Sequence, residues 1–367
     1  MQKSCCPCRV EIVEDLFGEN DVLNDVLRSL TSNEEPRVVI VADANFVHQT
    51  EGIGSKIGRY FNRHSIKLVS APVMISGGEK IKADNLQSAN LMIKAFLEAQ
   101  IGADDFVIAI GGGALLDVAS YAASQVRGGI PIIKVPTTPA AMMDAAFASD
   151  GRVDLLGVKD ALRISSKTAA ILIQPDFSKT VLDGVWRGSA SAAIQIAVAK
   201  SAGLLEKLEA NAEAFKARDL KVMEMIIREV VALRLSNGGT SLGEWAALRL
   251  EAISGYKLPR GYSLAIGVLV DLRISECRAL VSAEDRARVE KVLNEMGSLD
   301  GLFHSRHLMN QIDAILTGVD AWQLSNGKKS FVLPKAIGEE MAPDELDREV
   351  ALAALKNFFA VESGEKI

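Results

Sequence analysis

Short apolar runs rich in β-branched residues alternate with amphipathic stretches through the first half of the chain. Five of these runs have the pattern of buried strands, and they span residues 37–43, 66–75, 106–113, 130–138 and 169–175. Between the first three, residues 50–64 and 84–101 carry apolar side chains at helical spacing. A strand, helix, strand order predicts an α/β fold with a Rossmann-like parallel sheet, whose ligand site lies at the carboxyl ends of the strands.

The strand pattern stops near residue 181, and the remaining sequence is predicted to be helical. Long stretches with helical periodicity and no strand signal cover residues 186–215, 217–235, 242–267 and 283–297. We therefore expect two domains, an α/β domain over residues 1–180 and an all-α domain over residues 181–367.

Composition narrows the class of protein. The formal net charge of −6 argues against a nucleic-acid partner, because phosphate binding needs a basic surface. Apolar runs are too short to span a bilayer, and the N-terminus lacks the apolar core of a signal peptide, so we expect a cytoplasmic protein without a membrane partner. The cluster of Cys5, Cys6 and Cys8 is interpreted as a reduced chain end rather than a metal site.

A strand that ends in three glycines and enters a helix, FVIAIGGGALLD, is the first candidate for ligand binding. Gly112 and Gly113 would let the backbone approach a phosphate, which would meet free N–H groups at the start of the helix. Asp117 could accept hydrogen bonds from ribose hydroxyls, or it could be an ordinary acid near a helix start. At another strand end, Thr137 and Thr138 suit sugar or phosphate oxygens, although such residues are also common caps.

Six motifs follow one another along nearly the whole chain in an order typical of one enzyme family. They are GGEKIK (77–82), GGGALLD (111–117), VRGGIPIIKVPTT (126–138), PDFSKT (175–180), EAISGY (251–256) and RGYSLAIGVLV (260–270). In these motifs the chain resembles the 3-dehydroquinate synthase-like enzymes, or sugar phosphate cyclases, which are related to glycerol and iron-containing alcohol dehydrogenases. The resemblance implies an NAD-binding domain followed by a helical metal and substrate domain, in a homodimer.

The resemblance also implies an NAD site in the first domain. Carried over position by position, the cofactor-binding residues would be Asp43, Asn45, Glu79, Lys82, Gly112, Gly113, Asp117, Thr137, Thr138, Lys159, Phe177 and Thr180. Their chemistry agrees with this role, since glycines allow close approach, carboxylates accept from ribose hydroxyls and lysines offset phosphate charge.

In the second domain the family pattern fails at the metal site. As the resemblance implies it, the family oxidises a ring alcohol transiently with NAD, eliminates phosphate and closes a carbocycle, with a divalent metal held by one Glu and two His. Here the Glu position falls on Ala192, or on Ser191 if the register slips, and the two His positions fall on Glu244 and Arg260. The family's catalytic His falls on Leu248. We expect no metal at this site, because a guanidinium keeps its proton and has no lone pair to donate.

The positions that contact substrate in the family change as well. The four histidines, His48, His64, His304 and His307, all lie outside the ligand segments. Asp150 and Gln195 replace family lysines and Asp160 replaces an asparagine, so a doubly charged phosphate should be repelled. The residues left as candidate substrate contacts are Arg127, Asp144 and Lys328.

Two functional hypotheses follow. The first is a metal-independent NAD-dependent enzyme, either a cyclase of this family or an oxidoreductase, acting on a cyclitol, polyol or sugar-like substrate. In it Asp144 orients substrate or transfers a proton, and Arg260, paired with Glu244, replaces the electrostatic role of the metal. Alternatively, Glu244 and Arg260 are solvated charges at two helix ends. The second hypothesis is a catalytically inactive NAD-binding protein, a sensor or partner subunit. Ordinary metal-dependent dehydroquinate synthase activity is not favoured.

Overall fold

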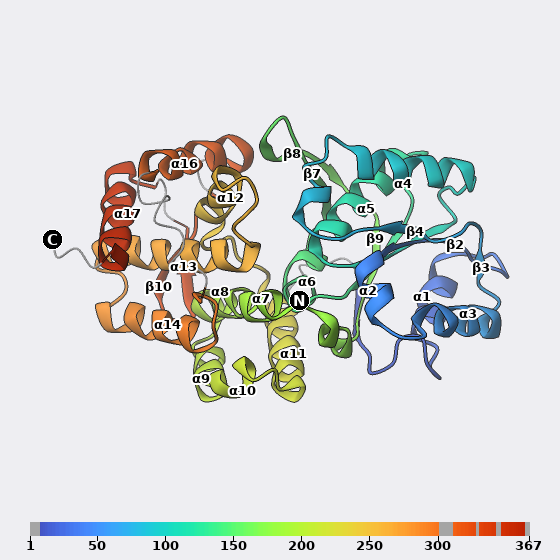
Figure 1. The fold of residues 1–367 in the computed structure, drawn as a ribbon, viewed down its shortest axis with the longest axis horizontal. Helices are drawn as coiled ribbons and strands as arrows, with labels where there is room; N and C mark the ends of the chain where they lie inside the picture. Colours follow the sequence, from blue (N-terminus) through green and yellow to red (C-terminus); the bar gives the residue numbers. More distant parts are fainter. Residues whose placement is uncertain (1–7, 301–310, 328–329, 343–345, 364–367) are drawn as a thin grey trace. The chain divides into compact units, whose positions relative to one another are not determined.

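The structure is a computed structural model that describes residues 8–300, 311–327, 330–342 and 346–363. It divides into two compact units, the N-terminal unit Cys6–Val181 and the C-terminal unit, which contains Leu182–Ile367 (Figure 1). Lys328, His304, His307, Cys5 and Cys6 lie outside the described residues.

A seven-stranded sheet forms the centre of the N-terminal unit, with the strand order β1-β9-β6-β5-β2-β3 and with β4 also paired to β2. Every pairing in this sheet is parallel, as the strand and helix alternation predicts. Its strands are β1 (Arg9–Ile12), β2 (Arg37–Asp43), β3 (Lys67–Leu68), β4 (Val73–Ile75), β5 (Phe106–Gly111), β6 (Ile132–Pro136) and β9 (Thr168–Ile173). The helices are α1 (Val22–Leu30), α2 (Ala44–Gln49), α3 (Ile53–His64), α4 (Gln87–Glu98), α5 (Gly113–Gln125) and α6 (Pro139–Met143), with 3-10 turns η1 (Glu79–Ile81), η2 (Ala145–Phe147) and η3 (Pro175–Thr180).

Two strand predictions need correction. The run 66–75 forms two short strands, β3 and β4, rather than one, and Pro72 between them has no N–H to donate to a ladder. The strand β1 was not predicted, and it pairs in parallel with β9 at the edge of the sheet. The apolar signal of β1 is weak because its RVEI sequence is only partly buried.

An antiparallel hairpin of β7 (Asp150–Leu155) and β8 (Val158–Ser165) was not predicted, because its strands carry many charged residues. It packs on α5 through Gly151, where an added Cβ would lie 2.0 Å from the backbone nitrogen of Tyr121. Only glycine permits this backbone approach, so Gly151 holds the charged hairpin against a buried helix.

The C-terminal unit is mostly helical, but it is not the all-α domain that the sequence predicts. A second antiparallel hairpin joins β10 (Leu333–Ala336) to β11 (Glu339–Met341). The helices are α7 (Asp183–Gly188), α8 (Ala190–Lys200), α9 (Ala202–Ala210), α10 (Ala212–Lys216), α11 (Leu220–Asn237), α12 (Glu244–Ile253), α13 (Arg260–Cys277), α14 (Ala283–Glu295), α16 (Ile312–Asn326) and α17 (Arg348–Ser363). In the described part of the chain, no helix is both long and apolar enough to cross a membrane.

Close glycine contacts fix how α12 and α13 begin. An added Cβ on Gly267 would lie 2.1 Å from the carbonyl oxygen of Gly243, the residue before α12. One on Gly261, the second residue of α13, would lie 2.3 Å from the carbonyl oxygen of Gly188. Gly243 also has a φ of 77°, which favours glycine. The first residues of both helices are therefore held by backbone packing.

Candidate functional site

The N-terminus of α5 is suited to bind an anion. Among the described residues, no side chain caps this helix end at Gly112. An added Cβ on Gly112 would lie 3.2 Å from Cγ2 of Thr138, and one on Gly113 would lie 2.8 Å from the Cβ of Ala145. The uncapped N–H groups and the positive end of the helix favour a phosphate group, and the glycines leave no side chain in its way.

Two of the polar residues predicted at strand ends have local structural roles. The Oδ1 atom of Asp43 accepts hydrogen bonds from the backbone N–H groups of Asn45, at 2.9 Å, and Gly77, at 3.2 Å. Thr138 caps α6, since its Oγ1 accepts from the N–H of Ala141 at 3.3 Å. These contacts order the loops at the carboxyl edge of the sheet.

Asp144 lies at the same edge of the sheet. It ends α6 and directly precedes Ala145, the residue that packs against Gly113. Asp144 therefore lies beside the start of α5.

Phe177 and Thr180 belong to η3. The Phe177 ring packs edge-on against Phe46 with centroids 4.9 Å apart, and Thr180 donates its hydroxyl to the carbonyl of Phe177 at 3.2 Å. Arg127, in contrast, follows the C-terminal end of α5, at the sheet edge opposite to the carboxyl ends of the strands.

Lys82 is buried between two carboxylates. Its Nζ lies 2.9 Å from Oδ2 of Asp117 and 2.6 Å from Oδ1 of Asp160. Burial lowers the pKa of Lys82, but the two carboxylates outweigh it and hold the pKa well above its usual range. Burial likewise raises the pKa of Asp160, yet the Lys82 ammonium lowers it further, and the net shift is downward. Burial raises the pKa of Asp117, and the Lys82 ammonium opposes this shift.

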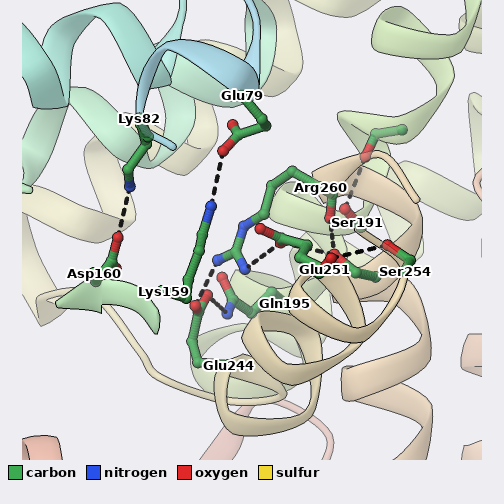
Figure 2. Close-up of polar contacts among 12 residues, drawn as sticks. Glu79, Lys82, Lys159, Asp160, Ser191, Gln195, Glu244, Glu251, Ser254 and Arg260 are labelled. Carbon is green, nitrogen blue, oxygen red and sulfur yellow. Dashed lines mark hydrogen bonds and ion pairs between the residues drawn. The ribbon is translucent and has the colours of Figure 1, made fainter. Parts of the chain in front are cut away.

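The charged hairpin extends this network. Asp150, predicted to repel phosphate, is paired with Arg152 at 2.7 Å and with Arg163 at 2.9 Å. Lys159 lies 2.9 Å from Glu79 and 3.6 Å from Asp154. Figure 2 shows the pair of Glu79 with Lys159 and the pair of Lys82 with Asp160. The structure thus brings the predicted residues Glu79, Lys82, Asp117, Asp150, Lys159 and Asp160 into one network.

In the C-terminal unit, Arg260 lies between two glutamates of α12. Its Nη2 is 2.5 Å from Oε2 of Glu244 and its Nη1 is 3.1 Å from Oε1 of Glu251 (Figure 2). The side chain of Arg260 is 28% exposed, that of Glu244 is 15% exposed and that of Glu251 is 1% exposed. Glu244 and Arg260 are therefore paired, and they are not two separate solvated charges.

Further donors complete this cluster. Gln195 is fully buried, and its Nε2 donates to the carbonyl of Leu242 at 2.7 Å and to Oε1 of Glu244 at 3.1 Å. Ser263 donates its hydroxyl to Oε1 of Glu251 at 2.9 Å. Both oxygens of Glu244 accept a hydrogen bond, so its carboxylate is oriented within the protein.

Asp271 supports the start of α12 from within α13. Its Oδ2 accepts from the N–H of Gly243 at 2.6 Å, and its Oδ1 accepts from the indole N–H of Trp245 at 2.8 Å. Burial raises the pKa of Asp271 to about 7. Because Glu244 lies between the two donors in sequence, Asp271 helps to set its position.

Comparisons with known proteins agree with these motifs. The family model described as 3-dehydroquinate synthase N-terminal matches residues 72–187. A 3-dehydroquinate synthase of Pyrobaculum islandicum is 28% identical over 269 residues, which is 67% of this chain and 77% of that protein. A 2-epi-valiolone synthase of Actinosynnema mirum is 24% identical over 363 residues, 95% of this chain and 91% of that protein. The chain is thus similar in sequence to 3-dehydroquinate synthases and to a 2-epi-valiolone synthase.

A solved structure has the same fold as this chain. It is the 2-epi-5-epi-valiolone synthase of Streptomyces hygroscopicus subsp. jinggangensis, with a TM-score of 0.80, 19% identity and coverage of 96% of this chain and 97% of that chain. That structure contains NAD+ and Zn2+.

The helical residues at the positions where the resemblance implies metal ligands do not fit a zinc ion. Ser191 donates its hydroxyl to the carbonyl of Gly188 at 2.7 Å, Ala192 has no ligand atom, and Arg260 has no lone pair. A zinc site needs three or four lone-pair donors. Within the residues that the structure describes, no group of three His, Cys, Asp or Glu side chains is arranged to hold a metal.

Sequence reasoning missed several residues of both clusters. In the C-terminal unit these are Trp245, Glu251, Ser263 and Asp271, and in the hairpin they are Arg152, Asp154 and Arg163. Glu251 follows Glu244 by seven residues, the spacing of one helix face. Asp271 is an acid inside an otherwise apolar helical run, which indicates a buried partner.

Proposed function

We propose that this protein is an NAD-dependent enzyme that oxidises a hydroxyl group of a cyclitol, polyol or sugar-like substrate, with net transfer of a hydride to NAD and without a divalent metal. The observation that carries the proposal is the Arg260 guanidinium held between Glu244 and Glu251. A cation is thereby built into the protein at a position where the family pattern has a metal ligand.

The N-terminal unit supplies residues that fit NAD. The uncapped start of α5, with Gly112 and Gly113, would hold the pyrophosphate. Asp43, Asn45 and Glu79 would contact the adenosine portion, as the resemblance implies. When bound, NAD supplies a hydride acceptor for the carbon that carries the substrate hydroxyl.

Arg260 and Asp144 have separate roles in this proposal. Arg260 stays protonated at all relevant pH values, so it would donate hydrogen bonds to the substrate oxygen as negative charge develops there. Glu244 and Glu251 orient its guanidinium. Asp144, beside the start of α5, would take up the hydroxyl proton.

The inactive NAD-binding protein remains the second candidate, and Leu248 is the observation that favours it. A leucine cannot transfer a proton, and the resemblance places it at a catalytic histidine.

Incubation of the purified protein with NAD and a panel of polyols and cyclitols distinguishes the two candidates. The enzyme proposal predicts formation of reduced nicotinamide with at least one compound, measured by absorbance, and its loss in Arg260→Met. Saturable NAD binding, measured by titration, with no reduction across the panel would instead support the inactive protein.

A further inference from the structure

The mixed-charge network of the N-terminal unit suggests what kind of substrate this site accepts. We propose that the substrate carries no phosphate group and is an uncharged, hydroxyl-rich molecule. This inference rests on the proposed function and deepens it, and its basis is the pairing of charges around the β7–β8 hairpin.

The carboxylates in this network outnumber the cations. The carboxylates are Glu79, Asp117, Asp150, Asp154 and Asp160, and the cations are Lys82, Arg152, Lys159 and Arg163. Each of the four cations lies within 4.0 Å of at least one of these carboxylates. These cations are therefore already engaged by carboxylates, and a phosphate dianion would have to compete with those carboxylates for each cation.

Burial keeps the strongest of these pairs together. The side chains of Lys82 and Asp160 are 5% and 11% exposed, so solvent screens their attraction only weakly. The N–H of Asp160 also donates to Oδ1 of Asp154 at 2.8 Å, which fixes Asp160 near the start of β8 against β7. A phosphate could recruit Lys82 only by displacing Asp160, and that carboxylate would then be buried without its cation.

Hydroxyl groups avoid this conflict. The side chains of Asp150 and Arg152 are 18% and 29% exposed, so the network offers both an acceptor and a donor to solvent. A hydroxyl donates to a carboxylate and accepts from a cation without adding charge. A polyol or cyclitol can therefore bind while the ion pairs remain intact.

Titration calorimetry with inorganic phosphate and with myo-inositol, each with NAD present, tests the inference. We expect no measurable phosphate binding to the wild type. Asp160→Asn and Asp150→Asn, each of which removes one carboxylate charge at nearly constant volume, should each tighten phosphate binding by about tenfold or more. Glu98→Gln removes an exposed carboxylate paired with Lys94 on α4 and should change nothing, because its partner is already solvated.

Two results would overturn the inference. One is millimolar or tighter phosphate binding by the wild type, and the other is unchanged phosphate affinity in both variants when their circular dichroism shows that they are folded. The nicotinamide assay separates this inference from the proposed function. If the protein oxidises phosphorylated polyols and no others, the proposed enzyme activity is supported and the proposed substrate class is wrong. If the variants bind phosphate more tightly but the protein oxidises no polyol, the charge argument is supported and the proposed enzyme activity is wrong.

Discussion

At the level of single residues, Arg260 has an unusual position for a cation. It is the first residue of α13, where the helix dipole disfavours positive charge. Glu244 and Glu251 offset this effect, and Glu251 in turn needs a cation because it is almost completely buried. The three charges are therefore interdependent.

Replacing Arg260 should destabilise the protein, because Glu244 and Glu251 would then lie close together without their cation. Arg260→Gln is expected to lower the free energy of unfolding by about 2–3 kcal/mol, less than for a fully buried pair because Arg260 is partly exposed. The double variant with Glu251→Gln added should regain part of the lost stability. Urea denaturation measures both, with Arg228→Gln, from an exposed pair on α11, as a control that changes stability by about 0.5 kcal/mol or less. Equal stability of Arg260→Gln and the wild type would contradict the interdependence.

Asp271 should make stability depend on pH. Its folded pKa of about 7 lies above the unfolded value of about 3.9, so the folded state holds this proton more tightly. The resulting stabilisation is fully present below about pH 4 and is lost as the pH rises to about 7, with a limit of about 4 kcal/mol. Asp271→Asn should abolish this decrease in stability with rising pH. The free energy of unfolding of both proteins, measured by urea titration between about pH 4 and pH 7, tests this. Parallel pH profiles would show that Asp271 does not titrate in this range.

At the level of elements, helix starts carry the candidate functional groups of each unit. The start of α5 offers uncapped N–H groups to an anion, and the starts of α12 and α13 present Glu244 and Arg260. In each case a glycine without room for a Cβ holds the helix end against its neighbour, as at Gly113 and Gly267.

Gly113→Ala should weaken cofactor binding. The new Cβ would lie 2.8 Å from the Cβ of Ala145, so the start of α5 must shift away from η2. We expect the Kd for NAD, measured by fluorescence titration, to rise by about tenfold. Gly54→Ala in α3 is the matched control, because an added Cβ there meets no atom within 4 Å. The same loss of affinity in both variants, or in neither, would argue against a cofactor site at α5.

At the level of the whole molecule, the sequence predicts the elements whose signal is local. The run predicted at 37–43 is β2, and the family motifs identify the fold. The β7–β8 hairpin was missed because its strands carry many charged residues, two of which, Lys159 and Asp160, pair with Glu79 and Lys82 far away in sequence. Of the two glutamates that bind Arg260, the sequence predicted only Glu244, which lies at a family position. Glu251 was missed because only the α12 helix places it beside Arg260.

The metal content of the active protein shows whether Arg260 takes the place of a metal ion. The protein, purified without chelator and shown to reduce NAD with a polyol, should contain far less than one metal ion per chain by plasma mass spectrometry, because Arg260 provides the cation. Its rate should also be unchanged after dialysis against a strong chelator. One zinc ion per chain, or activity lost with the chelator and restored by zinc, would contradict the account.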